Sequence, residues 1–176
     1  MQHNSSIKEV LIDEQSIKQR IKELGQQISN DYQGKTPLFI GVLKGAWVYM
    51  ADLLREIDVD CDVDFMSVSS YGNGRQTSGG ITIVKDLSVD CEGRDVIVVE
   101  DIVDSGITLS RLKELLLGRK AKSVEMTTLL SKPSRRIVDV DVKYIGFEIP
   151  DKFVIGYGLD WDGRMRHLRD VCVPNE

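Results

Sequence analysis

Three acidic residues lie close together in one short stretch of the sequence, next to a turn that contains glycine. Residues 96–99 form an unbroken β-branched run, which is typical of a strand buried on both faces of a parallel sheet. Glu100 and Asp101 follow at its carboxyl end, and Asp104 comes shortly after them. Carboxylates in such a position are suited to accepting hydrogen bonds from sugar hydroxyls, to holding Mg²⁺ or to moving a proton.

The residues after the third acid are suited to binding phosphate. Ser105, Gly106 and Thr108 precede a leucine-rich helical pattern, so a strand, a turn and a helix start follow one another. The turn amides and the positive end of the helix dipole point at one place, where open α/β sheets bind their ligands. A ligand with a phosphate, a ribose diol and a metal ion fits these features. The alternative interpretation is an ordinary acidic turn that only caps the helix.

Lys44 and Gly45 form a second candidate anion-binding loop, directly after an apolar strand expected at residues 38–43. Glycine lets the backbone approach a ligand closely, and the lysine adds positive charge. From residue types alone, a simple turn between a strand and a helix is the favoured interpretation. A P-loop is excluded, because no Gly-x4-Gly-Lys-Ser/Thr pattern occurs in the sequence.

Residues 69–80 are strongly polar, with four glycines and Tyr71 as the only large side chain. This composition predicts a mobile loop. It is either a hairpin tip or a lid that closes over a reaction centre and excludes water. Elsewhere, residue types alone favour a solvated side chain for Lys132, at a strand end, and a core position for Phe153.

Hydrophobic periodicity predicts the elements that must position these residues. A first helix should begin after Asp13 and end near Asn30, a second should span residues 46–57, and a third should end at Gly118. Their inward faces are expected to carry Ile17, Ile21, Leu24 and Ile28; Trp47, Met50, Leu53 and Leu54; and Leu109, Leu112, Leu115 and Leu116. Strands are expected at residues 10–12, 38–43, 60–67, 81–84, 96–99, 124–130, 140–149 and 153–160. The strand at 60–67 alternates, with a wet face formed by Asp60, Asp62 and Asp64.

The composition limits the classes of protein to consider. A chain of 176 residues suits one domain with a real core, and its net charge of −5 argues against a nucleic-acid binder. No apolar run approaches the roughly 20 residues of a membrane span, and residues 1–7 lack a hydrophobic signal core, so we expect a cytoplasmic protein. Zinc, disulfide and histidine-based sites are all disfavoured by the wide spacing of Cys61, Cys91 and Cys172 and by the presence of only His3 and His167.

Residues 98–108, Val-Val-Glu-Asp-Ile-Val-Asp-Ser-Gly-Ile-Thr, resemble the phosphoribosyl-pyrophosphate (PRPP) motif of the type I phosphoribosyltransferases. Residues 149–160 fit the pattern Ile-Pro-Asp-Lys-Phe-Val-x-Gly-Tyr-x-Leu-Asp of the purine-salvage members. The resemblance, to the hypoxanthine (hypoxanthine-guanine) phosphoribosyltransferases, covers about residues 38–173. It implies an α/β fold with a mostly parallel, twisted central sheet flanked by helices. It also implies a single domain, 1–176, with a mobile lid loop at about 69–80 and a small hood formed by the N-terminal segment and about residues 150–176.

The resemblance also implies roles for individual residues. PRPP and the nucleotide would be bound by Glu100, Asp101, Asp104, Ser105, Gly106, Ile107 and Thr108. Pyrophosphate would be bound by Lys44, Gly45 and Arg166, with a cis peptide between Leu43 and Lys44. Mg²⁺, the implied cofactor, would be held by Glu100, Asp101 and Asp160. Asp104 would accept the N7 proton as the purine attacks.

For the purine, the resemblance implies a site made of Lys132, Phe153, Val154 and Asp160. Lysine only donates hydrogen bonds, so Lys132 would select a 6-oxopurine over a 6-aminopurine. Phe153 would stack on the base, the backbone of Val154 would touch its edge, and Ser70 and Tyr71 would belong to the lid. The implied reaction joins hypoxanthine or guanine to PRPP and releases pyrophosphate. The expected partners are these small substrates and further copies of the chain in a dimer or tetramer, without nucleic acid or membrane.

Three alternatives remain. A relative that prefers xanthine or guanine is the nearest, because Lys132 alone does not exclude it. An RNA-binding pyrimidine-operon regulator of the same fold is disfavoured by the acidic balance and by the stretch around Phe153. A PRPP-sensing repressor would need a DNA-binding domain, for which no segment is a candidate.

Overall fold

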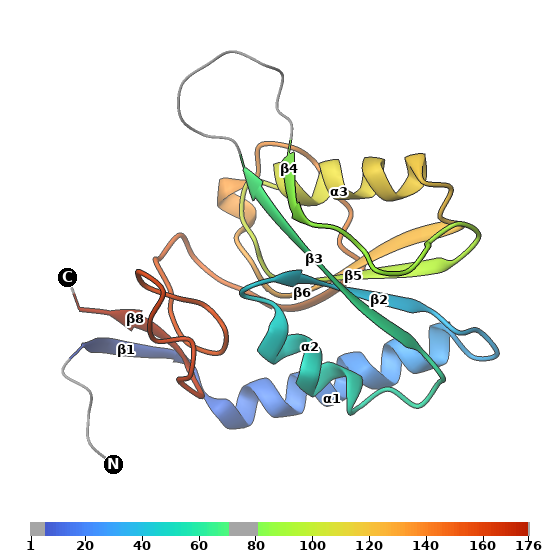
Figure 1. The fold of residues 1–176 in the computed structure, drawn as a ribbon. Helices are drawn as coiled ribbons and strands as arrows, with labels where there is room; N and C mark the ends of the chain where they lie inside the picture. The colour runs from blue at the N-terminus through green and yellow to red at the C-terminus, as the bar shows by residue number, and fades with distance from the viewer. Residues whose placement is uncertain (1–5, 71–80, 176) are drawn as a thin grey trace.

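The computed structural model describes residues 6–70 and 81–175. Its centre is a six-stranded sheet in the order β4-β3-β2-β5-β6-β7 (Figure 1). All neighbouring pairs are parallel except β3 and β4, which are antiparallel. The predicted mostly parallel α/β fold is thereby confirmed. The strands are β2 (Leu38–Leu43), β3 (Asp62–Ser70), β4 (Ile81–Lys85), β5 (Asp95–Val103), β6 (Ser123–Ser131) and β7 (Tyr144–Glu148).

Helices cover both faces of this sheet. The helices α1 (Glu14–Asp31) and α2 (Trp47–Leu54) lie on one face, and α3 (Ile107–Gly118) lies on the other (Figure 1). As predicted, α1 begins after Asp13, whose carboxylate accepts a hydrogen bond from the Ser16 amide at 2.7 Å and so caps the helix. Within the described chain, no helix combines the length and the apolar character needed to cross a membrane.

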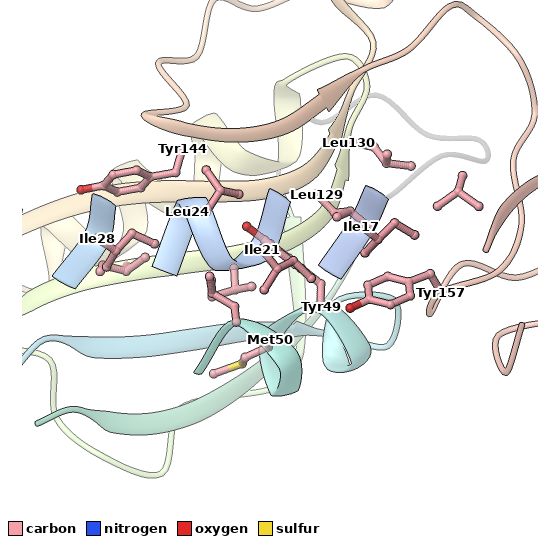
Figure 2. Close-up of a cluster of buried hydrophobic side chains, with 14 of the residues drawn as sticks. Ile17, Ile21, Leu24, Ile28, Tyr49, Met50, Leu129, Leu130, Tyr144 and Tyr157 are labelled. Atoms are coloured by element: carbon pink, nitrogen blue, oxygen red, sulfur yellow. The ribbon is translucent and has the colours of Figure 1, made fainter. Parts of the chain in front are cut away.

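The central strand β5 contributes side chains to two separate cores. Ile97 and Val99 pack with the apolar faces of α1 and α2, the cluster drawn in Figure 2. Val96 and Val98 point to the opposite face and pack with Leu109, Leu112 and Leu116 of α3. All four β5 residues are fully buried, so the β-branched run is buried on both faces, as predicted.

A second, small sheet joins the two ends of the described chain. In it, β1 (Ile7–Ile12) pairs antiparallel with β8 (Val171–Pro174). Figure 1 shows this pair beside the loops of residues 150–170, away from the centre of the large sheet. We call β1, β8 and residues 150–170 the hood.

Two predicted elements differ in the structure. Strand β5 continues to Val103, so the two adjacent acids of the motif lie within the strand rather than after it. No regular strand forms at residues 153–160, where only isolated bridges occur, such as Ile155 to Cys172. The reason is the backbone: Gly156, Tyr157 and Gly158 all have positive φ values of 91°, 49° and 99°. A strand has negative φ throughout, so three such residues in a row exclude it.

The predicted burial of two side chains is also wrong. Trp47 is 49% exposed at the start of α2, and Tyr49 is buried in its place. Asp64 was expected on a wet face but is only 6% exposed. Its carboxylate accepts hydrogen bonds from the amides of Phe65, Ser88 and Val89, which compensate the burial of its charge.

Candidate active site

The two acids within β5 are half-buried next to each other. Glu100 Oε1 accepts a hydrogen bond from the Asp101 amide at 3.3 Å, and Asp101 Oδ1 accepts one from the Ile102 amide at 2.7 Å. Burial, and after it the charge of Asp101, raise the pKa of Glu100 well above its usual range. Burial also raises the pKa of Asp101, although nearby hydrogen bonds and the charge of Arg166 oppose it. The pair therefore holds negative charge at a cost that a bound cation would relieve.

The loop at Lys44 and Gly45 lies directly against this pair. The peptide between Leu43 and Lys44 is cis, as the resemblance implied. A Cβ atom placed on Gly45 would lie 1.5 Å from Asp101 Oδ2, so only glycine fits there. The Lys44 side chain is exposed. The structure thus brings the two candidate loops together.

Arg166 connects the hood to the same place. Its Nη1 donates to the carbonyl oxygen of Gly158 at 2.6 Å, and its Nη2 lies 2.7 Å from Asp160 Oδ1. Gly158 in turn packs on Gly45, because a Cβ on Gly158 would lie 2.2 Å from the Gly45 carbonyl oxygen. Asp160 is thus paired with Arg166, and the described residues contain no cluster of three or more acids, histidines or cysteines arranged to hold a metal ion.

The turn expected to bind phosphate forms between β5 and α3. Gly106 is the N-cap residue of α3 and has a φ of 81°, a conformation that favours glycine. Ser105 O accepts hydrogen bonds from the amides of Ile137 and Val138, which hold the turn in place. A cavity of about 200 Å³ opens here, lined by Glu100, Asp101, Ile102, Val103, Asp104, Ser105, Gly106, Thr108 and Leu109. The amides of Ile107 and Thr108 lie in the first turn of α3, at its positive end.

The candidate purine-binding residues follow β6 and β7. Lys132 is 8% exposed rather than solvated, and its Nζ lies 3.7 Å from Asp151 Oδ1. Phe153 is 57% exposed, so the core position favoured by residue types alone is wrong. Its ring meets Trp161 edge to face, with centroids 6.5 Å apart. The Val154 side chain is buried. An exposed ring held by a second aromatic side chain is suited to stacking on a flat base.

Residue patterns missed two arginines beside this turn. Arg135 Nε donates to Asp104 Oδ1 at 2.7 Å. Arg136 Nη2 donates to Ser131 Oγ at 3.0 Å, and its side chain lies against Gly106. Their position just after β6 could have indicated them, because the end of β6 lies next to the end of β5.

The lid expected at 69–80 falls mostly on residues that the structure does not describe. Ser70 ends β3, and its backbone is paired with Ile81 of β4. Tyr71 lies outside the described residues.

A mostly parallel sheet with a glycine-containing turn after its central strand, an acidic pair and a glycine loop against that pair together match the architecture of a phosphoribosyltransferase. The family model for the phosphoribosyl transferase domain matches residues 8–162, and the chain belongs to this family. The resemblance found in the sequence is thereby confirmed.

Individual relatives show which members of this family the chain is similar to. It is 52% identical to the hypoxanthine-guanine phosphoribosyltransferase of Bacillus subtilis, over 98% of this chain and 95% of that protein. The crystal structure of a hypoxanthine phosphoribosyltransferase from Staphylococcus aureus matches with a TM-score of 0.94 and 43% identity, over 99% of this chain and 97% of that one. The bifunctional protein TilS/HprT of Listeria monocytogenes is 52% identical over 97% of this chain, which spans 26% of that longer protein.

Proposed function

We propose that the chain transfers the 5-phosphoribosyl group from PRPP to hypoxanthine and to guanine, forming IMP or GMP and pyrophosphate. One structural observation is the main support for this proposal. The turn after β5, the acidic pair, the Lys44 loop and Arg166 meet at one edge of the sheet, and the Lys132 amide donates to the carbonyl oxygen of Val103, at the end of β5, at 2.9 Å. Each group of PRPP and of a 6-oxopurine would have a chemically matched partner there.

PRPP would lie across this edge with its phosphate on the turn at Ser105 and Gly106 and on the first amides of α3. The carboxylates of Glu100 and Asp101 would accept hydrogen bonds from the two ribose hydroxyls. The pyrophosphate group would meet Lys44, the backbone of Gly45 and Arg166.

Magnesium fits this arrangement. Carboxylate oxygens are its preferred protein ligands, and Mg²⁺ is usually bound by one or two carboxylates plus substrate phosphates rather than by a closed protein cage. The Glu100–Asp101 pair meets this description, and Asp160 would join it only by giving up part of its contact with Arg166. When bound with PRPP, Mg²⁺ would neutralise the leaving pyrophosphate.

In the reaction, the bond between ribose C1 and pyrophosphate breaks, and positive charge builds on the sugar as in glycosyl transfer. Lys44 and Arg166 would balance the charge on the departing pyrophosphate. Purine N9 would attack C1, and Asp104 would accept the proton from N7. The negative charge of Asp104 also favours the cationic sugar.

Purine choice would depend on Lys132. Its ammonium group donates to the oxygen at position 6, and it has no acceptor for the amino group of adenine. Discrimination among hypoxanthine, guanine and xanthine concerns position 2 of the ring, which Lys132 does not read. An RNA-binding regulator is a weaker candidate, because the chain is acidic overall and its exposed Phe153 and buried Lys132 suit a free purine.

We further propose that residues 1–176 form one domain with a lid at about 69–80. We also propose that the chain forms a homodimer or homotetramer and that it is located in the cytoplasm. The family supports these assignments. Light scattering at micromolar concentration would test the oligomer, and a monomer that is fully active would contradict it.

The proposed function is tested by incubating the protein with hypoxanthine, PRPP and Mg²⁺. IMP and pyrophosphate should form in equal amounts, activity should vanish with EDTA, and it should return when Mg²⁺ is added in excess. Absence of IMP from a folded protein would overturn the proposal. Full activity in EDTA would overturn the role given to Mg²⁺.

A further inference from the structure

Four alternating charges connect the two groups proposed to contact the edge of the purine. Arg135 Nε donates to Asp104 Oδ1 at 2.7 Å, and Arg135 Nη1 donates to Asp151 Oδ2 at 3.3 Å. The other oxygen of Asp151, Oδ1, lies 3.7 Å from Lys132 Nζ. The order is therefore Asp104, Arg135, Asp151 and Lys132, with opposite charges at each contact.

These residues come from the ends of three neighbouring strands. Asp104 follows β5, Lys132 and Arg135 follow β6, and Asp151 follows β7. Arg135 is the last residue of a short 3-10 helix, Pro133–Arg135, that begins directly after Lys132. Because parallel strands end at the same edge of the sheet, the four charges join three loops that all face the candidate site.

This arrangement fixes the orientation of the side chains more than it stabilises the fold. The side chains of Arg135, Asp104 and Asp151 are about half exposed, at 51%, 44% and 51%. Exposed ion pairs contribute only about 0–1 kcal/mol to stability. A guanidinium group is planar, however, and its fixed fork of donors sets the direction of each carboxylate that it binds. Arg135 uses that fork on two carboxylates at once.

We propose that Arg135 is a positioning residue that, together with Asp151, orients the Asp104 carboxylate relative to the Lys132 ammonium group. Purine N7 and O6 lie side by side on one edge of the ring, so the two groups must be correctly placed with respect to each other to contact both atoms. The inference rests on the proposed function, because it requires Asp104 and Lys132 to meet the purine. Arg135 acts through the two carboxylates and does not contact a substrate.

The test compares Arg135→Gln with Arg119→Gln as a matched control. Arg119 forms an equally close pair with Asp86, at 2.6 Å and 2.8 Å, but it lies at the carboxyl end of α3, about 18 Å along the helix from the turn between β5 and α3. Arg135→Gln should lower kcat with hypoxanthine about 10- to 100-fold, as expected for a misplaced reacting group. The KM for PRPP and the melting temperature should stay unchanged. Arg119→Gln should leave kcat and both KM values unchanged.

Two further variants test whether Arg135 and Asp151 act through the same contacts, and whether the planar guanidinium group of Arg135 is required. Asp151→Asn should lower kcat to a similar degree, and the double variant with Arg135→Gln should be no worse than the stronger single variant, because both break one chain of contacts. Arg135→Lys retains the charge without the fork and should recover only part of kcat. Additive losses, or full recovery by lysine, would contradict the inference.

Other outcomes overturn it in distinguishable ways. A raised KM for PRPP with an unchanged kcat would assign Arg135 to direct contact with a phosphate. Unchanged kinetics of Arg135→Gln beside an active wild type would make it a surface ion pair and overturn this inference alone. An inactive wild type would overturn the proposed function itself.

Discussion

Asp104 lies in the turn before α3, but it does not cap that helix. The N-cap residue is Gly106, and it is Ser105 Oγ, not Asp104, that accepts a hydrogen bond from the Ile107 amide at the start of the helix, at 3.4 Å. The structure therefore contradicts the interpretation of Asp104 as a helix cap, which the sequence had left open. Its carboxylate instead meets Arg135 beside the cavity.

We predict that Asp104→Asn lowers kcat by about 10²–10⁴-fold, the usual contribution of a general base. Asparagine has nearly the same shape, so the KM for PRPP and the melting temperature should change little. Steady-state kinetics and thermal unfolding of the same preparation measure both. A variant that retains most of its kcat would show that another group takes the N7 proton.

Lys132 should determine which purines react. Lys132→Gln replaces a pure donor by an amide, which both donates and accepts. We expect hypoxanthine to react more slowly and adenine to become a measurable substrate. Initial rates with each base give the ratio of the two kcat/KM values. If this ratio is the same in wild type and variant, Lys132 does not read position 6.

At the scale of the elements, a hydrogen bond ties the loop of residues 153–160 to helix α2. The hydroxyl of Tyr157, which is buried, donates to the Asp52 carboxylate of α2. This bond holds the segment that carries Phe153 and Val154.

Tyr157→Phe should therefore destabilise the protein by about 1–3 kcal/mol, because a hydrogen bond to a charged acceptor is lost. It should also raise the KM for hypoxanthine. Tyr144→Phe is the control, since the Tyr144 hydroxyl donates to Asp31 at 2.7 Å, at a position outside the hood. That variant should lose comparable stability without a change in KM. An unaltered purine KM in Tyr157→Phe would mean that the loop holds its shape without this bond.

Asp64 orders the segment between β4 and β5 by accepting hydrogen bonds from the amides of Ser88 and Val89. Burial opposes its charged form, but the amides and the Lys85 charge outweigh burial and hold the pKa of Asp64 below its usual value near 3.8. A lowered pKa stabilises the fold above pH 3.8, and this contribution is lost as the pH falls through the lower, folded-state value.

Asp64→Asn should consequently cost about 1–3 kcal/mol at pH 7, because an amide has one oxygen for three donors. The difference from wild type should shrink as the pH falls below 3.8. Urea unfolding at pH 7 and at pH 3 measures it. Asp62→Asn, at an exposed position on the same strand, should cost less than about 1 kcal/mol. A pH-independent loss in Asp64→Asn would indicate a role in packing rather than charge.

For the molecule as a whole, periodicity was a reliable guide where one face of an element is buried. It predicted the start of α1 at Asp13, the end of α3 at Gly118 and the buried run of β5, because burial and capping leave a local pattern. It failed for Trp47 and Asp64, because no local pattern shows what packs against a given side chain.

The candidate site was predictable to the extent that its residues lie in contiguous motifs. The acidic stretch was found from residue types, and the family resemblance added the role of the Lys44 loop, Lys132, Phe153 and Arg166. The contact of Arg135 with Asp104 spans 31 residues, and only the neighbouring ends of β5 and β6 bring the two together. The pairing of Asp160 with Arg166 likewise depends on the folded loop of the hood.

The most direct test of the account is a comparison of four bases at saturating PRPP and Mg²⁺, with the nucleotide products separated and quantified. We predict efficient formation of IMP from hypoxanthine and of GMP from guanine, a rate with xanthine that Lys132 does not determine, and no AMP from adenine. Efficient formation of AMP, or the absence of both IMP and GMP, would contradict the assignment of this site to 6-oxopurine transfer.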